Sequence, residues 1–235
     1  MPREFEISRQ VTLPATPAQV WAAITAGTSG WMFPTESDDE AEGYRLLDDH
    51  QVLDWTPPER YALRAEQPDG SFNALEWVIE GRAGSTVLRF VHSGMLAEED
   101  WDHEYDGAAK HTDFYLHTLG QYVSHFPGRA ATYVAADAPE ASLAPDGFTR
   151  LLRALGVSEV GDKLEVGLAG EPRTAVVDHL DDWFLGLRTD DALYRVFGRN
   201  AWGAPVGVSL HLFSRDANAV SSGKALRGWL DTVYR

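Results

Sequence analysis

The chain has 235 residues, no cysteine and a formal net charge of −16. Its 44% hydrophobic content is enough for a buried core, and the lack of cysteine excludes disulfides and thiolate chemistry and favours a reducing compartment. No apolar run approaches the roughly 20 residues of a membrane helix, and the charged start MPREFEISRQ lacks the apolar region of a signal peptide. We therefore expect a cytoplasmic protein without a membrane span.

The negative charge is concentrated in the first half of the chain. Residues 1–129 hold nine Lys and Arg against 22 Asp and Glu, whereas residues 130–235 hold 11 against 14. An acidic surface repels phosphate backbones, so we expect no nucleic-acid partner. The simplest interpretation of this charge is a well-solvated surface.

The first predicted elements are a strand and a short helix. Alternating apolar residues from Phe5 to Val11 indicate a half-buried strand. Thr16 then has the properties of an N-cap and Pro17 those of a first helical residue, so a helix is predicted up to Gly27. The acidic stretch 36–42 is predicted to be an exposed loop or edge.

Several short strands are predicted before residue 95. Alternation is clear at Tyr61–Ala65, at Phe72–Glu80 and at Val87–His92, and the intervening Pro and Gly residues indicate turns. Their apolar faces need a cover. The segment Trp101–Arg129, whose apolar residues recur every three or four positions, predicts a long amphipathic helix that supplies it.

The second half begins with an Ala- and Pro-rich stretch, 130–144, which we interpret as a linker. Residues 145–235 then show a short helix, five strand-like runs and an amphipathic helix at Ala225–Tyr234. The sequence thus predicts a domain at 1–129 and a smaller α+β domain at 145–235. Because the order of elements is similar in both, the second domain is a candidate for a degenerate repeat of the first; an unrelated extension is the alternative.

Catalytic and metal-binding signatures are missing from the sequence. It has no G-x-S-x-G elbow, Walker A loop or dinucleotide fingerprint. The carboxylates near residues 98–106 complement the dipole at a helix N-terminus, and the histidines of that helix do not recur at i, i+4. We therefore predict no catalytic residues, no metal and no cofactor.

Four segments resemble the START-like, or SRPBCC, superfamily, in particular the branch named after activators of the heat-shock-protein-90 ATPase. They are EISRQVTLPAT, TPAQVWAAIT, STVLRFVHSG and LHTLGQYVSHF, and the resemblance covers about residues 3–126. It implies an α+β helix-grip fold, in which a curved antiparallel sheet wraps around a long C-terminal helix with a cavity between them. Two features depart from the family pattern: the short acidic segment between Pro34 and Leu46, and the absence of a Gly-Trp pair in the long helix.

Such cavities hold hydrophobic ligands, and aromatic side chains would line this one. The candidates come from the predicted sheet, the first helical segment and the long helix, although ordinary core packing is the competing interpretation of each apolar member. His92, on the strand face of Phe90, is the first candidate for a polar contact. The full candidate set is Trp31, Phe33, Trp55, Leu75, Trp77, Phe90, His92, His111, Tyr115 and Leu119.

The sequence favours a non-catalytic protein that binds or carries a small hydrophobic, aromatic or polyketide-like molecule. A polyketide cyclase or aromatase that uses a His or Tyr as general acid–base is one alternative. A co-chaperone is implied by the branch name alone and is not expected, because the separate chaperone-docking domain is not seen in the sequence. A homodimer stays open.

Overall fold

The computed structural model describes residues 3–35, 50–68, 70–96 and 101–235. The predicted acidic loop at 36–42 and the carboxylates at 98–100 lie outside the described residues. The chain divides into two compact units, Met1–Arg129 and Ala130–Arg235. In the described residues no helix is long and apolar enough to cross a membrane.

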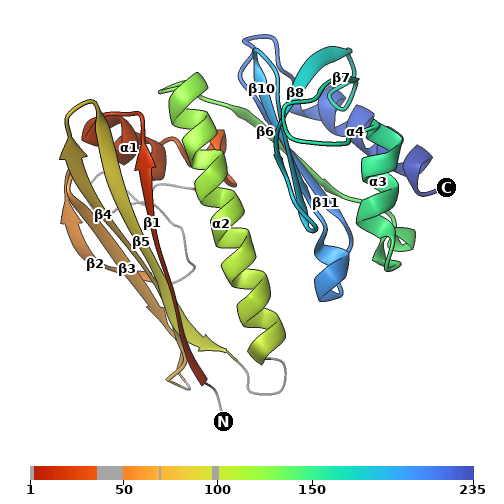
Figure 1. The fold of residues 1–235 in the computed structure, drawn as a ribbon. Coiled ribbons are helices and arrows are strands. Elements are labelled where there is room, and N and C mark those ends of the chain that lie inside the picture. Colours follow the sequence, from red (N-terminus) through yellow and green to blue (C-terminus); the bar gives the residue numbers. More distant parts are fainter. Residues whose placement is uncertain (1–2, 36–49, 69, 97–100) are drawn as a thin grey trace. The chain divides into compact units, whose positions relative to one another are not determined.

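The first unit is an antiparallel five-stranded sheet with two α-helices (Figure 1). The strand order is β1-β5-β4-β3-β2, so the first strand pairs with the last one. The elements are β1 (Arg3–Leu13), α1 (Pro17–Ile24), the 3₁₀ turn η1 (Thr28–Gly30), β2 (His50–Thr56), β3 (Arg60–Glu66), β4 (Phe72–Arg82), β5 (Ser85–Leu96) and α2 (Trp101–His125).

The helix α1 begins as the sequence predicts. The Thr16 side chain accepts a hydrogen bond from the backbone N–H of Gln19, and the Gln19 side chain accepts one from the backbone of Thr16. This capping box satisfies two N–H groups that would otherwise lack partners. Val20, Ala23 and Ile24 then turn inward and are fully or almost fully buried.

The long helix α2 packs against β1 and β5, and α1 packs against β4 and α2. Leu116, Leu119 and Val123 of α2 are buried, which confirms the predicted apolar stripe. The helix ends at His125, before the Pro127-Gly128 pair, and Gly128 has a φ of +71°, a left-handed conformation that glycine adopts without strain.

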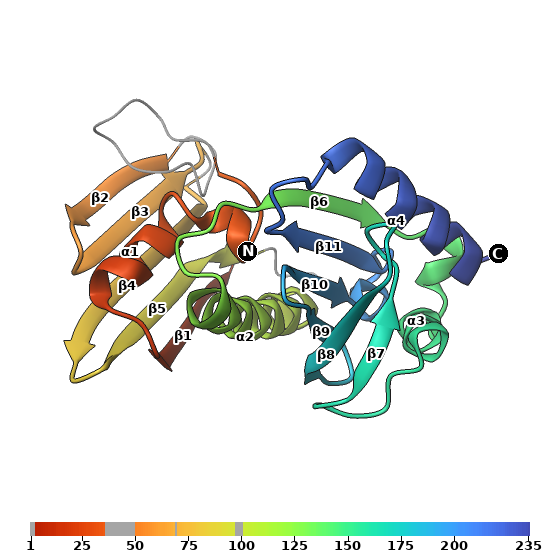
Figure 2. The same ribbon diagram turned by 90° about the horizontal axis from the view of Figure 1, so that it is seen from above.

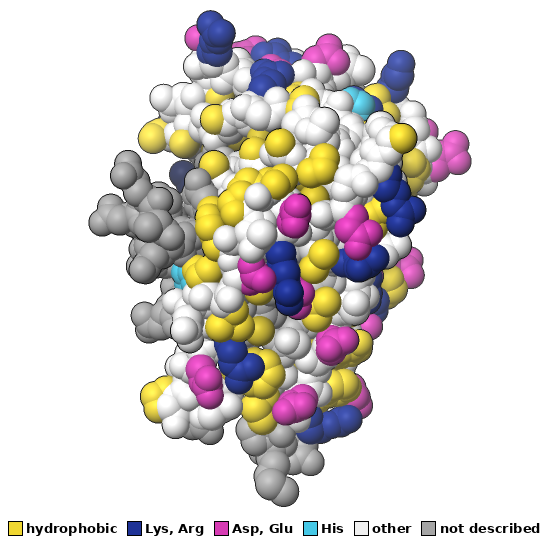
Figure 3. Space-filling model, turned by 90° about the vertical axis from the view of Figure 1, so that its left-hand side faces the viewer, with side chains coloured by type: hydrophobic (Ala, Val, Ile, Leu, Met, Phe, Trp, Pro, Cys, Tyr) yellow, Lys and Arg dark blue, Asp and Glu magenta, His cyan; other side chains and the backbone are white. Residues whose placement is uncertain are grey.

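The opposite face of this sheet carries paired charges. Arg60 lies 2.9 Å from Glu76, and Arg89 lies 2.9 Å from Glu80. Figure 3 shows charged side chains of both signs spread among apolar ones on this side of the molecule. Such exposed pairs contribute at most about 1 kcal/mol each, so the sheet gains little stability from this face and most from the helix-covered one.

The second unit is an antiparallel six-stranded sheet in the order β6-β11-β10-β9-β8-β7. Helices α3 and α4 lie on one face of it (Figure 2) and contribute Leu151, Leu226 and Leu230 to a single core. The elements are β6 (Thr132–Asp137), η3 (Glu140–Leu143), α3 (Gly147–Leu155), β7 (Lys163–Val166), β8 (Arg173–Leu180), β9 (Phe184–Arg188), β10 (Ala192–Phe197), η4 (Arg199–Trp202), β11 (Gly207–Leu212) and α4 (Ala219–Val233).

The interpretation of 130–144 as a linker is wrong. Thr132–Asp137 forms β6, which pairs antiparallel with β11, with Val134 opposite Leu210. The Ala-rich composition hid this strand, because small residues give a weak alternation even where the partner strand buries them. Glu140–Leu143 forms a 3₁₀ turn, in which the Ser142 hydroxyl accepts a hydrogen bond from the backbone of Val206 at 3.1 Å.

With β6 included, the two units follow the same order: a strand, a helix, a run of antiparallel strands and a closing helix. In both, the opening strand pairs with the last strand of the run, as β1 does with β5 and β6 with β11. The second unit has one more strand in its run. The closing helix α4 begins at Ala219, six residues earlier than predicted, because Asn218 caps it by accepting hydrogen bonds from the backbone of Val220 and Ser221.

Candidate functional site: an apolar cavity in the first unit

A cavity of about 240 Å³ lies between the start of β4, the end of β5 and the first half of α2. The segment after η1 contributes a further part of its wall. Its lining is mostly aromatic and aliphatic: Trp31, Met32, Phe33, Asn73, Leu75, Trp77, Phe90, His92, Ala108, His111, Thr112, Tyr115 and Leu116.

The sheet side of the cavity is built from aromatic residues that pair across strands. Tyr61 lies opposite Trp77, and Trp77 opposite Phe90, so all three point to the same face. Tyr61 and Trp77 stack at 5.3 Å with an angle of 17° between their planes, and Trp77 and Phe90 are also 5.3 Å apart. Trp77 is 3% exposed. Trp77 and Phe90 of this row line the cavity and give it an aromatic wall, with their ring planes 45° apart.

His92 is the main polar group of the sheet wall, and Asn73 is its partner. The two lie on neighbouring strands: His92 of β5 is opposite Leu75 of β4, and Asn73 is two residues before Leu75 on β4. The His92 Nε2 atom is 2.8 Å from Oδ1 of Asn73. An amide oxygen can only accept, so in this arrangement Nε2 carries the proton and donates it, which leaves Nδ1 as an acceptor.

The surroundings of His92 keep its imidazole neutral. Burial lowers its pKa from 6.5 to about 4, because the charged form would lose its hydration. Phe5 packs edge-on against the ring, with centroids 4.9 Å apart. At neutral pH, His92 and Asn73 therefore present hydrogen-bonding groups without charge.

The helix side adds three further polar side chains, His111, Thr112 and Tyr115. His111 donates a hydrogen bond from Nδ1 to the backbone oxygen of Gly107, one turn earlier, at 2.8 Å. Tyr115 lies edge-on to Trp31, with ring centroids 6.5 Å apart and planes at 82°. Trp31 is itself fixed by a hydrogen bond from its Nε1 to the oxygen of Ala23 at 2.8 Å. The cavity wall is thus held by bonds to the backbone on more than one side.

Eight of the ten predicted site residues line this cavity: Trp31, Phe33, Leu75, Trp77, Phe90, His92, His111 and Tyr115. Phe33 is 41% exposed, and Trp31 is 4% exposed. The residues of this set on β4 and β5 could be predicted from the alternation of the strands, and those on α2 from the 3.6-residue period of the helix.

Trp55 and Leu119 are not among the lining residues. Trp55 belongs to the edge strand β2, is 37% exposed, and packs against Trp21 of α1 at 4.8 Å and Tyr61 at 5.0 Å. Leu119 is fully buried, one turn beyond Tyr115 and Leu116. Each lies on the same face of its strand or helix as the lining residues, but that face extends beyond the part that borders the cavity.

The sequence-based set missed Met32, Asn73, Ala108 and Thr112, whereas Leu116 was expected on the inner face of the long helix and does line the cavity. Strand alternation could have predicted Asn73, because it lies two residues before Leu75 and therefore on the same face of the strand. Thr112 and Ala108 lie one and two turns before Leu116 on α2. Their small side chains gave little reason to select them, although small residues on the helix are what leaves room for a cavity.

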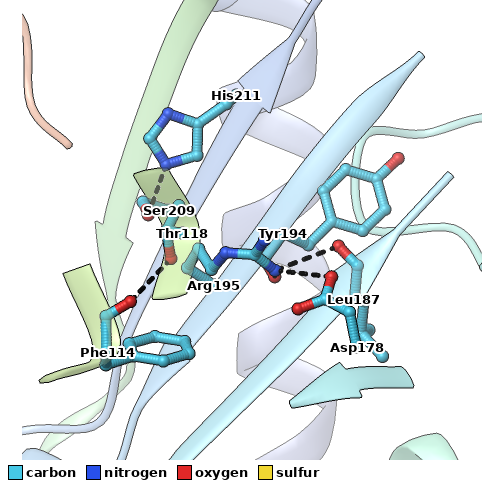
Figure 4. A network of polar contacts seen from close by, with 8 residues as sticks. All are labelled: Phe114, Thr118, Asp178, Leu187, Tyr194, Arg195, Ser209 and His211. Atoms are coloured by element: carbon cyan, nitrogen blue, oxygen red, sulfur yellow. Dashed lines mark hydrogen bonds and ion pairs between the residues drawn. The ribbon is translucent and has the colours of Figure 1, made fainter. Parts of the chain in front are cut away.

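Buried polar contacts also occur away from this cavity (Figure 4). In the second unit, the Arg195 guanidinium lies 3.1 Å from Asp178 and donates to the backbone oxygens of Leu187 and Tyr194 at 3.3 and 3.0 Å. Ser209 and His211 of β11 are 3.4 Å apart. Within α2, Thr118 donates to the oxygen of Phe114 at 2.9 Å. Some of these contacts join a side chain to the backbone and others join two side chains, and none of them involves a residue that lines the cavity of the first unit. Among the residues that the structure describes, no three His, Asp or Glu side chains are placed to hold a metal ion.

No family model and no curated protein matches the chain. Among solved structures, an AHSA1-like protein from Rhizobium etli is 26% identical, and the match covers 55% of this chain and 88% of that one with a TM-score of 0.42. DynU16, a protein of the dynemicin biosynthetic locus, is 15% identical over 97% of this chain and 95% of its own, with a TM-score of 0.40.

The Aha1 dimer from Colwellia psychrerythraea is 15% identical over 50% of this chain and 96% of that one, with a TM-score of 0.37. This chain is thus similar to AHSA1-like proteins over about half of its length and to DynU16 over nearly all of it.

Proposed function

We propose that the first unit binds a small hydrophobic molecule, aromatic or polyketide-like, in the cavity between its sheet and α2. The observation that carries the proposal is an apolar cavity with an aromatic wall at Trp77 and Phe90 and an uncharged polar pair, His92 and Asn73, at one place in it. Ligand sites in proteins combine these two properties: apolar area for affinity and a few polar groups for orientation.

The cavity volume restricts the ligand. About 240 Å³ is just below the usual range of roughly 300–1,000 Å³ for small-molecule sites. A flat ligand that buries about 300 Å² of apolar surface would gain about 7 kcal/mol, and association costs about 4 kcal/mol or more. The remainder is modest, so a hydrogen bond to the polar pair is needed to raise the affinity.

The polar pair also indicates which group the ligand carries. With Nε2 of His92 engaged by Asn73, Nδ1 can accept and the Asn73 amide nitrogen can donate. A phenolic hydroxyl suits both groups, because its single oxygen can donate a hydrogen bond to Nδ1 of His92 and accept one from the Asn73 amide nitrogen. A carboxylate is disfavoured, because an imidazole with a pKa near 4 offers it no positive charge at neutral pH.

A cyclase-like enzyme is the second candidate, because His92, His111 and Tyr115 line the same cavity. The pKa of His92 argues for binding over catalysis. A general base works best when its pKa is close to the working pH, and an imidazole with a pKa of about 4 is a weak base at pH 7. Turnover of a polyketide that is lost in His92→Gln but not in a stability-matched variant would favour the enzyme instead.

The proposal is tested by recovering the ligand. Native mass spectrometry on protein purified from its own host is expected to show a co-purified small molecule, and a hydrophobic fluorescent dye is expected to bind and be displaced by phenolic aromatics. A protein that carries no molecule and takes up neither dye nor any member of a lipid and polyketide panel would contradict it.

We further propose that both units are START-like helix-grip domains, the second a degenerate repeat of the first. The support is their common order of elements and the pairing of the opening strand with the last strand in each. Superposition of the two units over their shared strands tests this. The repeat interpretation fails if α2 and α4 do not then coincide.

A further inference from the structure

A second cavity, of about 310 Å³, lies within the second unit. It is formed by the start of β10, the end of β11, the first turn of α4 and the loops that precede β8 and α4. The cavity of the first unit also lies against two neighbouring strands and a closing helix, namely β4, β5 and α2. The lining differs in chemistry, because polar and charged side chains replace most of the aromatic ones.

Two hydroxyl groups on buried side chains line this second cavity. Tyr194 on β10 is 1% exposed, and Ser222 on α4 is 6% exposed. Among the described residues, neither hydroxyl has a hydrogen-bond partner. Other buried hydroxyls of this unit are paired: Tyr234 donates to the oxygen of Gly147 at 2.8 Å, and Ser142 accepts from Val206. Neither oxygen is among the buried, unsatisfied side-chain atoms of the described residues, so both are accessible and can form a hydrogen bond with a ligand that enters the cavity.

The charges around the cavity are unbalanced. Arg173 lies 3.9 Å from Asp191, so its charge is largely offset within the site. Glu171 and Asp216 add two further carboxylates to the lining. A concave site with this excess of negative charge attracts cations and repels anions.

We propose that the second unit holds its own site for a small polyhydroxylated molecule that bears a protonated amine. Hydroxyl groups of the ligand would pair with Tyr194 and Ser222, and the amine would lie near the carboxylates of Glu171 and Asp216. The site is separate from the cavity of the first unit, and its test does not depend on the outcome there.

Three sugars of the same ring size and different charge test the proposal. The full-length protein is titrated at pH 6.5 with D-glucosamine, D-glucose and D-glucuronate, and binding is followed by ¹H–¹⁵N NMR. The expected result is that glucosamine shifts the amides of Tyr194, Ser222 and the first turn of α4, that glucose binds more weakly, and that glucuronate does not bind. Equal binding of all three, shifts elsewhere, or no shifts with any of them would overturn the proposal.

Tyr194→Phe and Ser222→Ala are expected to weaken glucosamine binding by about 3- to 10-fold each, the loss of one hydrogen bond. Both are expected to unfold at the wild-type temperature or slightly above it, because neither removes a bond within the protein. Tyr105→Phe in the first unit is the matched control and should leave binding unchanged. Loss of stability in both cavity variants with unaltered binding would show that the hydroxyls serve the fold, which would also overturn the proposal.

A further variant tests whether the carboxylates at the cavity select for a positively charged ligand. Glu171→Gln together with Asp216→Asn keeps the side-chain shapes and removes two negative charges. The preference for glucosamine over glucose is expected to narrow severalfold. An unchanged preference for glucosamine over glucose would mean that the two carboxylates do not interact with the ligand's amine.

Discussion

The Nε2 atom of His92 lies 2.8 Å from Oδ1 of Asn73, across two neighbouring strands of the first unit. This contact ties the state of a half-buried imidazole to one amide side chain, and both residues line the same cavity. It is the feature that separates this wall from an ordinary aromatic core.

The first prediction concerns the state of His92. Its imidazole is expected to be neutral at pH 7, with the proton on Nε2, and to titrate near pH 4. Long-range ¹H–¹⁵N NMR correlation of the histidine rings reports both properties directly. A proton on Nδ1, or titration at the ordinary value near 6.5, would contradict the assignment.

The same pKa makes stability depend on pH. The folded state binds the His92 proton less readily than the unfolded chain does, so the free energy of unfolding should fall as the pH drops from about 6.5 towards 4. The loss attributable to His92 is roughly 1–3 kcal/mol, since the ring is half-buried and each pH unit counts for about 1.4 kcal/mol. Urea unfolding of wild type and His92→Phe across this range isolates it, because the variant should show a flatter profile.

Asn73 is expected to matter for stability through His92. Asn73→Ala leaves the Nε2–H group without its acceptor, which should cost roughly 1–3 kcal/mol. The double variant Asn73→Leu/His92→Phe removes both partners and should be close to the wild type in stability. Gln51→Ala, at an exposed site on β2, serves as the control for a simple truncation. Additive losses in the double variant would argue against a coupled pair.

Two glycines of the first unit should respond in opposite directions to alanine. A methyl group at Gly30 would lie 2.8 Å from Cδ2 of Tyr122, a residue that is 2% exposed and donates a hydrogen bond to Arg129. Gly30→Ala should therefore cost about 1–3 kcal/mol. Gly120, inside α2, has room for a methyl group, its nearest neighbour being Leu13 at 3.8 Å, so Gly120→Ala should stabilise by up to about 1 kcal/mol. Chemical unfolding of both variants checks the sign.

The buried ion pair of the second unit should be intolerant of single changes. The Arg195 and Asp178 side chains are 1% and 4% exposed, and burial lowers the pKa of Arg195 while Asp178 raises it. Asp178→Ala leaves a buried charge and should cost about 3–5 kcal/mol, whereas Arg195→Met/Asp178→Leu should recover most of that loss. Calorimetric unfolding measures both. A mild single variant would show that the pair contributes little.

Much of the first unit could be predicted from the sequence because its signals are local. Alternation at Leu75, Trp77 and Phe90 identified the inner strand face, and the period of Tyr115, Leu116 and Leu119 identified the apolar stripe of α2. Asn73 was passed over because a polar residue on an apolar face has meaning only once its partner is known. The strand at Thr132–Asp137 was missed because its identity comes from pairing with Gly207–Leu212, some 75 residues later.

The boundaries of the cavity were not predictable from such periodicities. Trp55 and Leu119 satisfy the same pattern as the lining residues, yet one packs on Trp21 at the sheet edge and the other fills the core. Where a cavity ends depends on the volumes of all the side chains around it, such as Ala108 and Thr112 on α2, and not on the pattern along any one element.

The most direct test of the central claim is to fill the cavity of the first unit from α2. Ala108→Trp places an indole in the space that Ala108 lines, whereas Glu104→Trp adds the same group at an exposed position one turn earlier. Binding of a hydrophobic dye or of the co-purified ligand is measured for both, alongside thermal unfolding to confirm that each is folded. We expect Ala108→Trp to weaken binding at least tenfold and Glu104→Trp to bind like the wild type. Undiminished binding by folded Ala108→Trp would contradict a ligand site between the sheet and α2.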